Sequence, residues 1–97
     1  MPEVIAIEDV DGLYRLRVLD TIGDEFAIYF SEAKDGDYRI ALVRLPEDVD
    51  WNVDVFQEMI GVRDEAVEYF ERNGYTVPDA SFDLNQVTPY DDDPHND

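Results

Sequence analysis

Carboxylates are the side chains of this sequence with the widest range of possible chemistry. Asp and Glu account for 25 of its 97 residues, against 7 Lys and Arg. Several occur as Asp-x-Asp groups, whose oxygens are the ligands that hard cations prefer: Asp9 and Asp11, Asp35 and Asp37, Asp48 and Asp50, and Asp91 to Asp93. A calcium loop closes on a glutamate about twelve residues from its first ligand, and neither Glu32 nor Glu47 completes one. Since Asp beside Gly is ordinary turn chemistry, we interpret these groups as turns and expect no metal.

The inventory of catalytic side chains is small. The sequence has no cysteine, one histidine, His95, and the serines Ser31 and Ser81, neither of which lies in a nucleophile elbow. A serine or cysteine triad is therefore excluded. A pair of carboxylates can also perform acid and base catalysis, but spacing alone does not single out one pair among so many. We expect a protein that is not an enzyme and that needs no cofactor.

Five acids lie between residues 47 and 58, and no Lys or Arg interrupts them. Further acids follow at three- and four-residue spacing, which places neighbours about 5 to 6 Å apart on one helix face. This is close to the spacing of phosphates on a nucleic-acid strand, so a groove built for phosphates would accept such a row. The candidate partner-binding residues are Glu47, Asp48, Asp50, Trp51, Asp54, Glu58, Asp64, Glu68 and Glu71. The alternative interpretation is the solvated face of an ordinary helix.

Aromatic residues are the candidate anchors of such an interface. Charge supplies association rate and register, whereas affinity usually depends on a few large side chains. The candidates are Trp51, Tyr69 and Tyr90. Trp51 is favoured because it lies inside the acidic stretch, and the competing interpretation is a buried Trp51 that joins a helix to a sheet.

The formal net charge of −18 narrows the possible partners. Such a field repels phosphates and anionic lipids and attracts basic surfaces, so we expect no direct binding to nucleic acid or membrane. The leading hypothesis is a small inhibitor that occupies the basic nucleic-acid-binding surface of another protein, a nucleic-acid mimic of the anti-defence or immunity type. The rival hypothesis is a halophilic solvent adaptation of a small module or assembly subunit, because Lys is scarce and Asp exceeds Glu. Clustered acids favour the inhibitor, and evenly spread acids favour the adaptation.

Hydrophobic periodicity indicates the elements that must position these residues. Alternation over residues 13–19 places Tyr14, Leu16 and Val18 on one face and Arg15 and Arg17 on the other, which predicts a mixed outer face for the sheet. A β-branched run at residues 4–7 and similar alternation at residues 26–30 and 38–43, joined by Gly-containing links, predict four strands in antiparallel hairpins. Residues 82–87 are a candidate fifth strand.

Apolar residues at three- and four-residue spacing between residues 55 and 70 predict a helix that ends near Gly74. Its candidate N-caps are Asp48, Asp50 and Asn52. Gly61 lies in the middle, so this segment is either one helix or two. The segment also has the spacing of a helix-turn-helix motif, but the helix that would contact DNA carries net negative charge, so we reject DNA recognition.

The chain is predicted to form one α+β domain over residues 1–87. We expect an antiparallel meander of four or five strands with one C-terminal helix, possibly two if it breaks at Gly61, packed on one face. Residues 88–97 contain four Asp, two Pro and the only His, which predicts a disordered acidic tail. The sequence contains no cysteine, no signal peptide and no apolar run of about 18 residues, which together predict a cytoplasmic protein.

Overall fold

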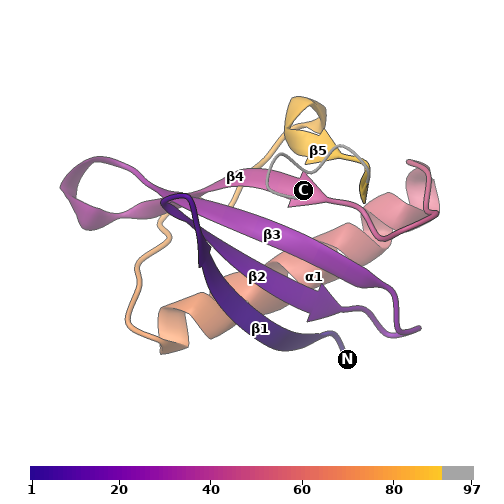
Figure 1. Ribbon diagram of the computed structural model, residues 1–97, viewed down its shortest axis with the longest axis horizontal. Coiled ribbons are helices and arrows are strands. Elements are labelled where there is room, and N and C mark those ends of the chain that lie inside the picture. The colour runs from indigo at the N-terminus through magenta and orange to yellow at the C-terminus, as the bar shows by residue number, and fades with distance from the viewer. Residues whose placement is uncertain (91–97) are drawn as a thin grey trace.

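The computed structural model describes residues 1–90, which form one sheet covered on one face by one long helix (Figure 1). The strands lie in the order β1-β2-β3-β4-β5, and the first four are joined as antiparallel hairpins. The elements are β1 (Glu3–Val10), β2 (Leu13–Leu19), β3 (Glu25–Glu32), η1 (Lys34–Gly36), β4 (Tyr38–Arg44), α1 (Val53–Arg72), η2 (Leu84–Gln86) and β5 (Val87–Thr88). The predicted α+β fold, with a single helix on one face of a mostly antiparallel sheet, is confirmed.

Asp-Gly dipeptides form the tips of two hairpins. Asp11 and Gly12, between β1 and β2, have φ values of 51° and 84°. Asp35 and Gly36, between β3 and β4, have φ values of 67° and 81°. Two consecutive positive φ values are typical of a type I′ turn, whose twist matches that of the flanking strands. The Asp-x-Asp groups at these two places therefore serve as turns.

The fifth strand differs from the antiparallel strand that the sequence predicts. Leu84–Gln86 form a short 3-10 helix, and only Val87–Thr88 pair with β4, in parallel register. The parallel direction follows from the connection, because α1 carries the chain back along the sheet before the chain returns beside β4. Gln86 holds this return in place, since its Nε2 donates a hydrogen bond of 2.8 Å to the carbonyl oxygen of Ile40.

α1 is one unbroken helix of 20 residues, which resolves the alternative left open at Gly61. Its N-cap is Asn52, whose Oδ1 accepts a hydrogen bond of 2.9 Å from the backbone N–H of Val55. The helix ends just before the predicted Gly74, whose φ is 96°. A Cβ built on Gly61 would lie 3.9 Å from Cγ of Pro2, so the chain before β1 passes close to the helix at this point. The continuous helix leaves no turn of the helix-turn-helix type.

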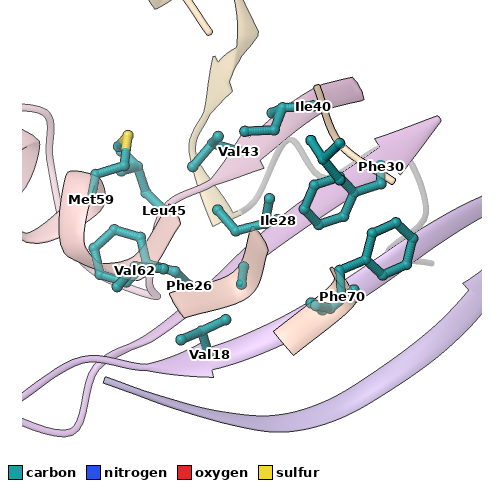
Figure 2. Packing of buried hydrophobic residues seen from close by; sticks show 13 residues of the cluster. Val18, Phe26, Ile28, Phe30, Ile40, Val43, Leu45, Met59, Val62 and Phe70 are labelled. Carbon is teal, nitrogen blue, oxygen red and sulfur yellow. The ribbon is translucent and has the colours of Figure 1, made fainter. Parts of the chain in front are cut away.

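The core lies between α1 and the facing side of β2, β3 and β4 (Figure 2). Phe26, Ile28 and Phe30 project toward the helix from alternate positions of β3 and are fully or almost fully buried (Figure 2). Phe70 of α1 closes one end of the core. Its ring stacks on Phe30 and on Tyr75, with centroids 4.4 and 4.2 Å apart. These contacts fix the orientation of α1 and therefore determine which of its residues face solvent.

The first residues of the predicted tail, residues 88–90, contact the end of β4 and the residue that follows it. The backbone N–H of Leu45 donates a hydrogen bond of 2.8 Å to the carbonyl oxygen of Thr88. The ring of Tyr90 lies 4.7 Å from the guanidinium carbon of Arg44. The rest of the predicted tail, residues 91–97, lies outside the described residues. Within residues 1–90, no helix combines the length and the apolar character needed to cross a membrane.

Candidate protein-binding surface

The outer face of the sheet, opposite α1, carries paired charges. Strand alternation and register place Arg15, Arg17 and Arg44 on this face. Glu8 accepts hydrogen bonds from Nε of Arg15 at 2.9 Å and from Nε of Arg17 at 3.1 Å. Glu25 lies 3.5 Å from Arg17 and 3.3 Å from Arg44. We call these five residues the sheet-face network, and they give the outer face the mixed charge that the sequence predicts.

Burial and pairing shift the pKa values of two members of the sheet-face network, Glu8 and Arg15. Partial burial opposes the ionisation of Glu8, but the hydrogen bonds and positive charges of Arg15 and Arg17 outweigh it and lower the pKa of Glu8. Burial also opposes the charged form of Arg15, but hydrogen bonding to Tyr29 and Glu8 raises the pKa of Arg15 above its usual value. Arg44 is the most covered of the arginines, with a side chain that is 6 % exposed. The charges on this face are therefore held in compensating pairs.

The acids of the β4–α1 loop, residues 45–52, and of the first turns of α1 are arranged differently. No Lys or Arg occurs between residues 45 and 62. Among the ion pairs formed within residues 1–90, none includes an acid from this stretch. We call this set the β4–α1 acids: Glu47, Asp48, Asp50, Asp54 and Glu58. Four of the five are exposed and Glu58 is half-buried, so this end of the molecule carries uncompensated negative charge.

The other acids of the predicted site lie farther along α1 and are partly compensated. Asp64 pairs with Arg63 at 3.0 Å, and Glu68 pairs with Arg72 at 3.2 Å. At the rise of an α-helix, the last of the predicted acids, Glu71, lies about 27 Å from the start of the helix. The predicted acids thus do not form one uniform row, because within residues 1–90 Asp64 and Glu68 take part in ion pairs, whereas Glu71 and the β4–α1 acids take part in none.

A cleft of about 350 Å³ lies between the first turns of α1 and the turn that joins β2 to β3. Apolar side chains and four carboxylates line it, without any Lys or Arg among the lining residues; the acids are Asp20, Asp24, Asp54 and Glu58. Asp20 shapes the turn, because its Oδ1 accepts hydrogen bonds from the backbone N–H groups of Ile22 and Asp24 at 3.0 and 2.9 Å. Such a cleft suits the aliphatic stem and cationic head of a Lys or Arg from another molecule. The sequence prediction missed Asp20 and Asp24, since only the fold brings them beside α1.

The three candidate anchors differ in exposure. Trp51 is 41 % exposed, and its ring packs edge to face against Phe56 with centroids 5.6 Å apart. The interpretation of a buried Trp51 that joins helix to sheet is therefore wrong. Tyr69 and Tyr90 are partly buried, each with an arginine beside its ring. Trp51 is thus the candidate anchor best placed to meet another molecule.

Comparison with known proteins assigns no function to this surface. No protein-family model, curated protein or solved structure matches the chain. Among residues 1–90, no three side chains of the types His, Cys, Asp or Glu gather in a way that could hold a metal ion. The function of this surface must therefore be inferred from its charges, its cleft and its exposed side chains.

Proposed function

We propose that this protein is a small acidic inhibitor that binds the basic, nucleic-acid-binding surface of another protein. The observation that carries the proposal is the unequal pairing of charge in two regions of the molecule. The sheet-face network joins its carboxylates to guanidinium groups at 2.9 to 3.5 Å. The β4–α1 acids take part in none of the ion pairs of residues 1–90. Acids that the chain itself leaves uncompensated are free to neutralise the cations of a partner.

The geometry of these acids supports nucleic-acid mimicry. Asp54 and Glu58 lie one turn apart on α1 and line the same cleft as Asp20 and Asp24. Carboxylates one helical turn apart are separated by about 5 to 6 Å, close to the spacing of phosphates along a strand. A groove that holds phosphates would therefore meet a comparable series of negative charges. The net charge of −18 would also speed the encounter with a basic surface, by roughly 10- to 1000-fold at low salt.

Halophilic adaptation is the alternative explanation of the acidity. It predicts acids spread evenly, because the whole surface meets the same solvent. Acids outside the β4–α1 set, such as Glu32, Asp35 and Asp37, also take part in none of the ion pairs of residues 1–90. What supports the inhibitor is the position of the cations, since three of the seven Lys and Arg lie in the sheet-face network and none lies between residues 45 and 62. In this proposal the protein acts in the cytoplasm. A chain without cysteine forms no disulfide and therefore needs no oxidising compartment. It acts by binding protein, without catalysis and without direct contact with nucleic acid.

Capture followed by competition tests the proposal. The chain is immobilised through its N-terminus and exposed to cell lysate in about 50 mM KCl, where charge interactions are weakly screened. We expect it to retain at least one nucleic-acid-binding protein, and short duplex DNA or tRNA to release that protein by competing for the same basic surface. Retention of nothing, or of proteins that neither nucleic acid releases, would contradict the proposal.

Two charge-reversed variants of equal net charge locate the binding surface. They carry, respectively, Glu47→Lys with Asp50→Lys and Glu58→Lys, and Asp64→Lys with Glu68→Lys and Glu71→Lys. Asp48 is left unchanged because its φ of 61° is tolerated better by Asp than by Lys. We expect the first variant to bind the captured partner at least about 100-fold more weakly, and the second to lose less than about tenfold. Equal losses would mean that total charge, rather than this surface, drives binding.

A further inference from the structure

Beside the β4–α1 acids, four apolar side chains surround a shallow hollow. They are Trp51, Val53, Phe56 and Leu84, which we call the Trp51 patch. Val53 is 74 % exposed and Leu84 is 61 % exposed. A second hollow of about 240 Å³ shares Trp51 and Leu84 and extends to Val87 of β5. The exposed apolar surface is therefore continuous from the start of α1 to the segment that returns beside β4.

The packing of residues 1–90 does not account for this patch. The buried residues of α1, such as Met59 and Val62, face the sheet and complete the core without it. Single exposed apolar side chains are normal on a protein surface, but contiguous ones mark sites of association. Here two segments that are distant in sequence, the start of α1 and η2, supply one apolar surface. We infer that another molecule covers it.

The surroundings of the patch define the chemistry of that molecule. The two segments that form it contain no Lys or Arg over residues 45–62 and 81–90, but contain the β4–α1 acids and Asp83. This negative field excludes phosphates and anionic lipids. It also disfavours a second copy of this chain, because two copies joined at the patch would bring like charges together. A basic partner segment that carries an apolar residue satisfies both the field and the patch.

We propose that the Trp51 patch seats one aliphatic or aromatic side chain from a Lys- or Arg-rich segment of the partner, while the β4–α1 acids bind the flanking cations. This inference rests on the proposed function and adds the place where affinity is concentrated. Tryptophan is among the residues that dominate binding energy when an interface buries them. Trp51 and Phe56 already contact each other with ring centroids 5.6 Å apart, so this part of the binding surface is formed before the partner binds.

Two short synthetic peptides of equal positive charge test the inference. Both alternate lysine with glycine, and one has two central glycines replaced by leucine. Trp51 is the only tryptophan of the chain, so its fluorescence reports directly on the patch. In about 50 mM KCl we expect both peptides to bind, and calorimetry to show the leucine peptide binding about tenfold more tightly. Only the leucine peptide should shift the emission of Trp51 to shorter wavelength, because only it excludes water from the ring.

Two matched substitutions separate the patch from exposed apolar surface in general. Leu84→Ser alters the patch, and Ile5→Ser alters a side chain on β1 that is 44 % exposed. We expect Leu84→Ser to reduce the tenfold gain of the leucine peptide to less than about threefold, and Ile5→Ser to preserve it. Equal affinity of the two peptides with unchanged Trp51 emission, or loss of the gain in both variants, would overturn this inference and leave the proposed function standing. Failure of both peptides to bind would overturn both.

Discussion

The sheet-face network and the β4–α1 acids place charge in opposite ways on a chain whose net charge is −18. In the network, Glu25 is shared by Arg17 and Arg44 at 3.5 and 3.3 Å, and the side chains of Arg15 and Arg44 are only 18 % and 6 % exposed. The β4–α1 acids instead lie mostly in solvent, next to an acid-lined cleft and the Trp51 patch. The first arrangement holds one chain together, and the second is suited to contact with another.

The positions of the few cations distinguish these two regions more clearly than the number of acids does. The chain has 7 Lys and Arg, and three of these residues belong to the sheet-face network while none lies between residues 45 and 62. Solvent adaptation can explain a high content of Asp and Glu, but it gives no reason for exposed apolar residues to gather beside the β4–α1 acids. An interface with a basic partner gives such a reason.

Reversing a charge in the sheet-face network should have the largest effect on stability. Glu25→Lys places a third cation between Arg17 and Arg44, where burial of Arg44 limits screening. We expect the free energy of unfolding to fall by about 2–3 kcal/mol. Asp50→Lys makes the same change of net charge on the uncompensated side and should stay within about 0.5 kcal/mol of the natural sequence. Urea denaturation followed by circular dichroism measures both, and equal effects would refute the contrast between the two sides.

The strands and the helix that carry the sheet-face network and the β4–α1 acids are predictable from sequence, because they depend on local signals. Alternation and Asp-Gly dipeptides predict β1 to β4, and the three- and four-residue spacing predicts α1 up to Gly74. The parallel pairing of β5 has no such signal, since it depends on where the helix returns the chain. The 3-10 helix before β5 is set by Asp83, whose side chain accepts a hydrogen bond of 2.9 Å from the backbone N–H of Asn85. Alternation of Phe82, Leu84 and Val87 therefore predicts too long a strand.

The candidate site is predictable only where it is contiguous in sequence. The acids between residues 47 and 58 stand out because no cation interrupts them. Pairing of Glu68 with Arg72 is a local signal that was open to sequence reasoning, since residues four apart meet on a helix. By contrast, Asp20 and Asp24 reach the cleft, and Leu84 reaches Trp51, only through tertiary packing. No local sequence pattern predicts either of these tertiary contacts.

Removing the repulsion among the β4–α1 acids should have an intermediate effect on the free energy of unfolding. Glu47→Gln, Asp50→Asn and Glu58→Gln together remove three charges of like sign, so we expect the free energy of unfolding in about 50 mM KCl to rise by about 1 kcal/mol. In about 1 M KCl this gain should vanish, because salt already screens the repulsion. Thermal and urea denaturation across this range measure the change. A natural chain that folds only in molar KCl would instead support solvent adaptation.

Protonation of Glu8 should have the smallest effect. Burial opposes ionisation, but Arg15 and Arg17 lower the pKa of Glu8 below its usual value of 4.5. The ionised form therefore stabilises the fold above that value, and this contribution is lost as pH falls through the lowered pKa of the folded chain. Because the Glu8 side chain is 35 % exposed, we expect a contribution of less than about 1 kcal/mol. Glu8→Gln should thus flatten the dependence of the urea midpoint on pH between about 5 and 3.

Arg15→Gln provides the control for this last prediction, because it keeps Glu8 ionisable and removes one of its two guanidinium partners. Titration of the Glu8 carboxyl group by nuclear magnetic resonance should show its pKa rising toward 4.5. The acid dependence of the urea midpoint should weaken without disappearing, since Arg17 still pairs with Glu8. An unchanged pKa would mean that Arg15 does not compensate Glu8, and the sheet face would then differ from the β4–α1 acids less than its ion-pair distances indicate.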